Sequence, residues 1–323
     1  MKILITGAAG FVGFHLSKML LDKGFEVVGL DSLSGYYSTQ LKQDRLAQLK
    51  PYQNFSFSGI DICKRSDIEA LFVSSNFEMV IHLAAQPGVR YSVDAPHKYV
   101  ESNLLGFMNV LEASRQSRIK HFVFASSSSV YGNRKDGAFS EEGDTDHPES
   151  LYAATKKSNE LIAYSYSQQF GIQAIGLRFF SVYGPWGRPD MAYFSFTKKI
   201  LNGEAIPVFN NGEMIRDFTY IDDICKGVCN MIEKIKELPR YKVYNLGNNR
   251  PHTLTAMIEA IENPLGKKAV IELKPMQAGD VVFTCADITE AQRDFGFNPQ
   301  TSLKDGLKNF VAWFHNYYRP TNN

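Results

Sequence analysis

Short apolar segments alternate with helix-length segments along the first 180 residues, and this alternation restricts the possible folds more than any other feature of the chain. Strands are expected at residues 2–7, 26–31, 55–61, 79–85, 121–127 and 174–180. Helical patterns lie between them, including residues 12–23, 67–76, 99–116 and 152–169. Strands that are apolar on both faces and alternate with helices are typical of a parallel sheet covered on both sides. The sequence therefore predicts an α/β fold with a doubly wound parallel sheet.

After residue 180 the alternation becomes less regular, which indicates a second, smaller unit. The segment "YGPWGRPD" (183–190) is predicted to be a loop from its proline and glycine content. One more core strand is expected at residues 241–247, and helices near residues 191–202, 253–262 and 302–317. We expect residues 1–180 and 217–247 to form the first domain. The smaller domain, a mixed α/β unit, is expected at residues 181–216 and 248–323.

Charge balance and cysteine content argue against several classes of protein. The 323 residues include 35 Lys+Arg and 34 Asp+Glu, so nothing indicates a basic surface for nucleic acid or a membrane. No apolar run approaches the ~18–20 residues of a membrane span, and no secretory signal precedes the first strand. The four cysteines form no CxxC pair, and their spacing suits neither a zinc site nor a disulfide framework. We therefore expect a cytoplasmic protein with no metal, nucleic-acid or membrane partner.

A glycine-rich segment directly after the first strand indicates dinucleotide binding. This segment, "GAAGFVG", contains Gly7, Gly10, Phe11, Val12 and Gly13. Its glycines allow a tight turn and let a pyrophosphate approach backbone N–H groups at a helix N-terminus. Asp31 ends the second strand, where a carboxylate can bind both ribose hydroxyls and repel a 2′-phosphate. No arginine follows it, so the pattern favours NAD over NADP in a Rossmann-like domain; a structural turn with a chance aspartate is the alternative. Asp61 and Ile62 follow the third strand and could contact adenine, although aspartate is also a common turn residue there.

Two further motifs indicate catalysis. In "YAATK", Tyr152 and Lys156 are spaced i and i+4, so they share one face of the expected helix. A phenol has a pKa near 10, and a neighbouring cation together with a positively charged nicotinamide would lower it toward that of a useful base. "SSSS" (126–129) ends a strand, on the side of a parallel sheet where ligands bind. The alternatives are an ordinary solvated Tyr–Lys pair and a flexible serine linker.

The combination of GAAGFVG, Asp31, "HLAA" (82–85), "SSSSVYG", "YAATK" and "YGP" resembles the extended short-chain dehydrogenase/reductase superfamily of nucleotide-sugar enzymes, the NAD-dependent epimerase/dehydratase family. The resemblance implies that Tyr152 is the base, that Lys156 binds the nicotinamide ribose, and that Ser127 binds the reacting sugar hydroxyl. It implies further contacts with tightly bound NAD from Leu83, Ala84, Ala85 and Asn103. It also implies a homodimer that packs the helices near residues 99–116 and 152–169, and a role in polysaccharide biosynthesis.

The serine run bears on the type of reaction. Related dehydratases have Asp and Glu immediately before "VYG", and related decarboxylases have Glu before the valine. Here these positions are Ser128 and Ser129, which cannot act as an acid or base at neutral pH. The resemblance makes both of them second-rank candidates for substrate contacts. Epimerisation at sugar carbon 4 needs only the tyrosine, so we expect a 4-epimerase. A dehydratase, a decarboxylase and a non-catalytic NAD-binding protein are less favoured alternatives.

Resemblance in the second unit suggests the sugar. "YGPWGRPDM" and "QPGVRYS" (86–92) are similar to segments of UDP-glucuronate 4-epimerases, which implies that Arg188 holds a sugar carboxylate and adds Arg90 to the substrate site. Arg216 is implied to bind the diphosphate and Asp280 the nucleotide ribose. Ser181 stands where the family usually has Asn, and Gln277 where hexose epimerases often have Arg. The expected reaction interconverts UDP-glucuronate and UDP-galacturonate, with a neutral UDP-hexose or UDP-N-acetylhexosamine as the alternative substrate.

Overall fold

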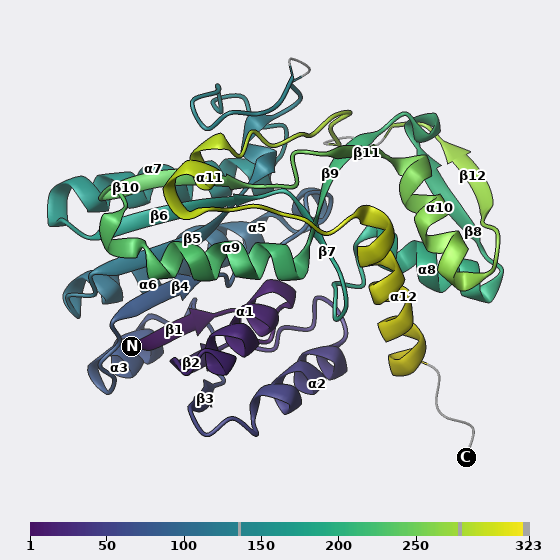
Figure 1. Cartoon of the computed structure of the whole chain (residues 1–323). Coiled ribbons are helices and arrows are strands. Elements are labelled where there is room, and N and C mark those ends of the chain that lie inside the picture. The colour runs from purple at the N-terminus through teal and green to yellow at the C-terminus, as the bar shows by residue number, and fades with distance from the viewer. Residues whose placement is uncertain (135–136, 277–279, 319–323) are drawn as a thin grey trace.

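A seven-stranded parallel sheet forms the centre of the molecule in the computed structural model, which describes residues 1–134, 137–276 and 280–318. The strand order is β10-β6-β5-β4-β1-β2-β3, with every neighbouring pair parallel (Figure 1). The strands are β1 (Lys2–Thr6), β2 (Glu26–Leu30), β3 (Phe55–Ser58), β4 (Met79–His82), β5 (His121–Ser127), β6 (Gln173–Phe179) and β10 (Tyr241–Leu246). The prediction of a doubly wound α/β fold is confirmed.

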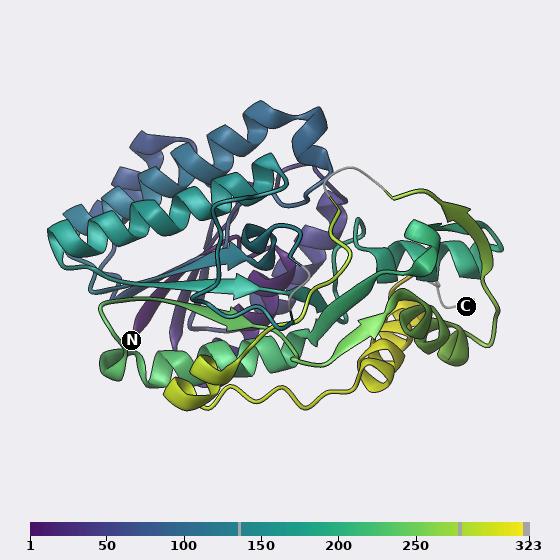
Figure 2. The ribbon, with the colours of Figure 1, turned by 90° about the horizontal axis from the view of Figure 1, so that it is seen from above.

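Helices cover both faces of this sheet (Figure 2). One face carries α1 (Phe11–Asp22), α2 (Thr39–Leu49) and α9 (Ile221–Glu233), and the other carries α3 (Arg65–Val73), α6 (Gly106–Gln116) and α7 (Leu151–Phe170). Successive residues of a strand point to opposite faces. Accordingly Ile3 and Ile5 pack in one core cluster and Leu4 in the other, all three fully buried. This two-sided burial explains why the strands are apolar throughout.

A smaller unit lies beyond one end of the main sheet (Figure 1, right). It contains a three-stranded sheet of β7 (Ser181–Tyr183), β9 (Ile215–Tyr220) and β11 (Pro251–Thr253), and a parallel pair of β8 (Ala205–Phe209) and β12 (Val270–Lys274). Its longer helices are α8 (Ala192–Asn202), α10 (Leu254–Leu265) and α12 (Leu303–Tyr318). Three shorter helices lie outside this unit: α4 (Tyr91–Asp94) and α5 (Pro96–Tyr99) beside α7, and α11 (Thr289–Phe295) beside β10.

Two elements can be compared with the expected domain boundaries, β10 and α11. β10 joins the main sheet beside β6, as expected for a segment that returns to the first domain. α11, which we expected in the second domain, also packs on the main sheet: Tyr244 of β10 donates a 2.7 Å hydrogen bond to Asp294. The domain boundaries therefore stay a prediction.

Two local expectations differ from the structure. The third strand ends at Ser58 rather than at residue 61, so Asp61 lies in a loop, where its carboxylate accepts a hydrogen bond from Cys63 N. The single helix expected at residues 99–116 contains a π-helical segment, η1 (Val100–Leu105), before α6. π-Helical insertions are common at functional sites, and this one carries the buried Asn103. In the part of the chain that the structure describes, every helix is too short or too polar to span a lipid bilayer.

Candidate active site

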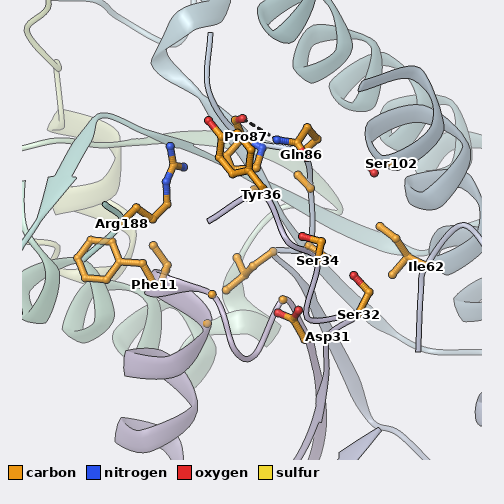
Figure 3. A pocket seen from close by; sticks show the side chains of 18 of the residues that line it. Phe11, Asp31, Ser32, Ser34, Tyr36, Ile62, Gln86, Pro87, Ser102 and Arg188 are labelled. Atoms are coloured by element: carbon orange, nitrogen blue, oxygen red, sulfur yellow. Dashed lines mark hydrogen bonds between the residues drawn. The ribbon is translucent and has the colours of Figure 1, made fainter. Parts of the chain in front are cut away.

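A pocket of about 870 Å³ opens at the carboxyl ends of the central strands (Figure 3). Gly7 follows β1, Asp31 follows β2, Leu83 follows β4, and Ser127 ends β5; all four line the pocket. The strand order changes direction at β1: β2 and β3 follow on one side of β1, and β4, β5 and β6 follow on the other. Ligands of open parallel sheets bind at such a switch point, so the fold itself places the site here.

The glycine-rich turn forms a cradle that side chains would fill. Gly7 has φ +75°, and a Cβ there would lie 2.8 Å from Ala84 N. A Cβ at Gly13 would lie 2.1 Å from Gly7 O. Helix α1 begins after Gly10 without a side-chain cap, so its first N–H groups are available to a ligand. The turn therefore fits a pyrophosphate at a helix N-terminus, as NAD requires.

Asp31 lies at one end of the pocket with Ser32 and Ser34 (Figure 3). Its two carboxylate oxygens accept hydrogen bonds from Ala9 N (3.2 Å) and Leu33 N (2.8 Å), which fix the side chain at the pocket surface. The sequence interpretation missed Lys42 of α2, whose Nζ donates to Ser34 O at 2.8 Å. Burial lowers the pKa of Lys42, and the charge of Asp31 opposes this. This end of the pocket thus has a lysine beside the aspartate.

The remaining residues expected to contact NAD divide into two groups. The pocket is lined by Gly10, Phe11, Val12, Gly13, Asp61, Ile62, Leu83, Ala84 and Ala85. Asn103 does not line it. Its side chain instead accepts a hydrogen bond from Gln86 N (2.7 Å) and donates to Gln86 O (3.2 Å), so it holds a residue of the wall.

Tyr152 and Lys156 both line the pocket from α7, and Ser127 lines it from the end of β5 beside Tyr152. Lys156 Nζ lies 6.0 Å from the ring centroid of Tyr152 and donates to Ala125 O at 2.9 Å. Burial lowers the pKa of Lys156 to about 8. Burial also raises the pKa of Tyr152, while a hydrogen bond with Ser127 and the charge of Arg188 lower it. Tyr152 therefore needs added positive charge near its hydroxyl to act as a base at neutral pH.

Helix α7 is anchored so that these side chains are held in place. The Ser150 side chain caps its first turn by accepting from Ala153 N, and Gly171 ends it in the left-handed conformation. Glu160, one turn beyond Lys156, forms a buried ion pair of 2.8 Å with Arg178 of β6. The Glu160 carboxylate also accepts a 2.6 Å hydrogen bond from Ser126. The ion pair thus joins α7, β5 and β6 directly behind the site.

The serine run is ordered and is not a linker. Ser126 and Ser127 line the pocket, whereas Ser128 and Ser129 lie in a 3₁₀ turn, η2 (Ser128–Tyr131), behind it. Ser127 Oγ accepts hydrogen bonds from Ser129 Oγ (2.9 Å) and Ser129 N (3.2 Å). Ser129 therefore orients Ser127 in this structure, and the pocket side of the run carries hydroxyl groups only.

Arg188 lines the pocket from the loop after β7, away from Asp31 (Figure 3). Its guanidinium forms two hydrogen bonds with Asp190, of 3.0 Å from Nε and 2.6 Å from Nη2. Burial alone would raise the pKa of Asp190, but the Arg188 charge holds that pKa below its usual value. Tyr36, which the sequence interpretation missed, donates to the same carboxylate at 3.2 Å. The Arg188 guanidinium is thus oriented by the protein before any ligand binds.

A second cluster outside this pocket brings together three residues expected to bind substrate. Arg90 forms a 2.8 Å ion pair with Asp280. Arg216 donates to the backbone carbonyls of Ile215 (3.0 Å), Val282 (2.9 Å) and Val281, and burial lowers its pKa to about 10 while Asp280 opposes this. Ser181 is partly buried on β7. Gln277 lies outside the described residues.

Three residues that line the pocket, and Arg45 behind its wall, could not be recognised from the sequence. Lys42 and Arg45 lie in the segment "LKQDRLAQL", where a lysine and an arginine among polar residues look like a solvated helix face. The structure buries both, with Arg45 fully buried. Tyr36 and Tyr37 precede this helix and line the same pocket. Only the position of the helix, packed beside the glycine-rich turn, reveals their role.

The fold and the pocket define a dinucleotide-dependent enzyme of the doubly wound class. The model of the NAD dependent epimerase/dehydratase family matches residues 3–247, and the chain belongs to this family. It is 46% identical over 333 residues to UDP-glucuronate 4-epimerase 2 of Arabidopsis thaliana, covering 98% of this chain and 76% of that protein. It is 48% identical over 334 residues to Protein CapI of Staphylococcus aureus, covering 99% and 100%.

Solved structures give the same result. The UDP-glucuronic acid 4-epimerase of Bacillus cereus, in complex with UDP-glucuronic acid and NAD, matches with a TM-score of 0.92 at 36% identity, covering 98% of this chain and 100% of that one. A UDP-glucose 4-epimerase of Thermotoga maritima with UDP-glucose matches with a TM-score of 0.90 at 30% identity, covering 99% and 100%. The family inferred from the motifs is thereby confirmed.

Proposed function

We propose that the protein is an NAD-dependent nucleotide-sugar 4-epimerase that interconverts UDP-glucuronate and UDP-galacturonate. The observation that carries this proposal is one pocket that contains Tyr152, Lys156 and Ser127 together with Arg188, an arginine oriented by Asp190. The first three residues suit transient oxidation of a sugar hydroxyl. The arginine suits a sugar that carries a carboxylate.

Each residue has a defined part in this reaction. The glycine-rich turn and Asp31 would hold NAD, which would supply the hydride acceptor and donor for sugar carbon 4. Ser127 hydrogen-bonds the carbon 4 hydroxyl, and Tyr152 removes its proton as carbon 4 is oxidised. After the keto sugar rotates to present its other face, Tyr152 would give the proton back to the oxygen on carbon 4 as that carbon is reduced. Lys156 holds the nicotinamide ribose and keeps a positive charge beside Tyr152.

The reaction stops at epimerisation because the serine turn offers no acid. Elimination of water would need a second proton donor and acceptor near carbons 5 and 6. The residues at the corresponding places are Ser128 and Ser129, whose hydroxyl groups do not titrate near neutral pH. Elimination of water is therefore not supported at this site, and loss of CO₂ is the competing reaction that the site must prevent.

We propose that Arg188 binds the sugar carboxylate with two parallel hydrogen bonds. Once carbon 4 is oxidised, the uronate becomes a β-keto acid, which readily loses CO₂ when the carbon 5–carbon 6 bond stands perpendicular to the keto group. An arginine held by Asp190 and Tyr36 can keep the carboxylate away from that geometry. Arg90, Arg216 and Asp280 are proposed to bind the UDP moiety from the second cluster.

The test compares substrates in one variant. Purified Arg188→Ala is assayed with UDP-glucuronate and with UDP-glucose, and the ratio of the two kcat/KM values is compared with the ratio for the unaltered protein. Because Arg188 also lowers the pKa of Tyr152, part of the loss is common to both substrates and cancels in the ratio. We expect the uronate to lose at least tenfold more, about the worth of one charge-assisted hydrogen bond. An equal loss on both substrates contradicts the carboxylate assignment, and Arg293→Ala, which removes an exposed arginine, is the matched control.

We also propose a homodimer formed through η1, α6 and α7. The residues that support it are large apolar side chains exposed on these helices: Val100, Leu105, Leu161, Tyr164 and Phe170, each 45–58% exposed. We expect Leu161→Glu to shift the protein to a monomer in light scattering after gel filtration, while the exposed-site control Val73→Glu leaves the mass unchanged.

We further propose that the protein acts in the cytoplasm. The four cysteines of the described chain are free and three of them are buried, which suits a reducing cytoplasm. There the enzyme would supply a nucleotide uronate for polysaccharide biosynthesis.

A further inference from the structure

Three consecutive carbonyl groups of the loop before Arg188 are held by side chains from the two helices that flank the cofactor turn. His15 of α1 hydrogen-bonds Pro185 O at 2.9 Å. Arg45 of α2 donates to Trp186 O at 2.6 Å from Nη2, and to Gly187 O at 3.1 Å. Burial lowers the pKa of His15 to about 4, so its ring is neutral and the nitrogen facing Pro185 O carries the proton. The loop that carries Arg188 is therefore attached to the dinucleotide-binding half of the molecule at three successive residues.

Arg45 also binds the cofactor turn itself. Its Nη1 donates to Ala9 O at 2.9 Å and to the Tyr37 hydroxyl at 2.7 Å. Ala9 lies inside the glycine-rich turn, and its N–H donates to Asp31. One guanidinium thus connects the turn that holds the pyrophosphate with the loop that presents Arg188.

The burial of Arg45 makes this connection unusual. The side chain is fully buried, yet no carboxylate among the described residues forms an ion pair with it. A buried charge without a counterion is strongly unfavourable unless hydrogen bonds replace its hydration. Here the acceptors are neutral oxygens from two loops and a tyrosine, so the loops must keep their positions for the cation to remain satisfied.

The held loop is itself in a strained conformation. Trp186 has φ +59°, a left-handed conformation that is uncommon for a bulky residue. Its ring packs against Trp313 and Tyr317 of α12, at centroid distances of 5.3 and 5.1 Å. Residues held in sparsely populated conformations persist only where the surroundings over-determine them, and they gather at functional sites.

We propose that Arg45, assisted by His15, is a positioning residue that fixes Arg188 relative to the cofactor turn. It thereby sets where the sugar carboxylate lies when carbon 4 is oxidised. This inference rests on the proposed function. Its chemical consequence is protection of the keto intermediate from losing CO₂. In that side reaction the carbon 5–carbon 6 bond breaks, its electron pair moves toward the carbon 4 keto group to give an enolate, and a proton later adds to carbon 5.

The decisive variants are Arg45→Lys and His15→Leu. Arg45→Lys keeps the charge, but one ammonium group cannot reach acceptors in both loops. His15→Leu removes a single neutral hydrogen bond at the other anchor, so it keeps the inference testable if Arg45→Lys does not fold. The matched control is Gln173→Leu, because Gln173 Nε2 donates to the carbonyls of Ile235, Leu238 and Pro239, at the opposite end of the sheet.

The first readout needs no substrate. Amide hydrogen exchange of NAD-loaded protein should show at least tenfold faster exchange in residues 184–190 of Arg45→Lys, a smaller increase in His15→Leu, and no change there in Gln173→Leu. The control should instead exchange faster around residues 235–239. Unchanged exchange at residues 184–190 in folded variants overturns the inference, even if the protein is a UDP-glucuronate 4-epimerase.

The second readout is the fate of UDP-glucuronate. The fraction of substrate that ends as decarboxylated UDP-pentose should rise by about tenfold to hundredfold in Arg45→Lys, the scale expected for a displacement of about 1 Å. Gln173→Leu should keep the partition of the unaltered protein. If both loop variants keep that partition, the inference is wrong. If the unaltered protein does not act on UDP-glucuronate at all, the proposed function fails instead.

Discussion

Lys156 should cost the protein stability at neutral pH, and replacing it with methionine should therefore stabilise the fold while stopping turnover. Lys156 is 3% exposed, and burial lowers its pKa from 10.5 to about 8. The difference corresponds to about 3 kcal/mol of unfavourable free energy for the charged form at pH 7. Methionine fits the same space but leaves Ala125 O without its 2.9 Å hydrogen bond, which costs about 1 kcal/mol. The net expectation for Lys156→Met is a gain of about 2 kcal/mol in the free energy of unfolding at pH 7.

The pH dependence gives a sharper form of this prediction. Because the pKa of Lys156 is lower in the folded protein than in the unfolded chain, the unfolded chain binds more protons between about pH 8 and 10.5. The unaltered protein therefore gains stability relative to the variant as the pH rises through this window. The advantage of Lys156→Met should shrink and then reverse sign at about pH 9 to 10.

Urea unfolding of nucleotide-free protein at pH 7, 8, 9 and 10 measures both free energies. Lys308→Met, which removes an exposed lysine of α12, is the control and should differ little from the unaltered protein at any of these pH values. The reasoning is refuted if Lys156→Met is less stable than the unaltered protein at pH 7. It is also refuted if the gap between the two does not change with pH.

Further predictions address the base, its support and the cofactor. Tyr152→Phe should lower kcat by at least about a thousandfold with the same unfolding midpoint, and measurable epimerisation close to the original rate would exclude Tyr152 as the base. Arg178→Met leaves the buried Glu160 carboxylate without its cation and should lower the free energy of unfolding in urea by about 3–5 kcal/mol. The double variant Arg178→Met, Glu160→Leu should lose less. Equal losses in the two variants would contradict the paired arrangement. Asp31→Ser removes the carboxylate that would repel a 2′-phosphate, and it leaves Lys42 nearby. The ratio of NADP affinity to NAD affinity, measured by fluorescence titration, should therefore rise at least tenfold. An unchanged ratio would show that Asp31 does not select the cofactor.

The sequence predicted the parts of the fold that repeat a simple pattern. The parallel strands are apolar on both faces because both faces are buried, and they were predicted to within a few residues. The short strands β7, β8, β9, β11 and β12 were not predicted. β12 is an example: its residues Val270–Leu273 are exposed, so it lacks the alternation or continuous burial that marks a strand.

In the site, too, residues that belong to a sequence motif were predicted, and residues that belong to none were not. The structure brings Tyr152, Lys156, Ser127 and the glycine-rich turn into one pocket, as predicted from motifs with fixed spacings at strand ends and on one helix face. Arg45 and Lys42 were not, because only tertiary packing decides whether a cation on a helix is solvated or buried. Asn103 was predicted as a cofactor contact, but it binds the backbone of Gln86 behind the wall of the pocket.

The most direct test of the central claim follows one hydrogen atom through the reaction. Purified NAD-loaded protein is incubated in ordinary water with UDP-glucuronate that carries deuterium at carbon 4, and the product is isolated by chromatography and examined by NMR and mass spectrometry. Transient oxidation at carbon 4 with return of the same hydride predicts UDP-galacturonate that retains deuterium at carbon 4, with UDP-pentose as a trace product only. A product without the label, a decarboxylated main product, or turnover of UDP-glucose alone would contradict the account.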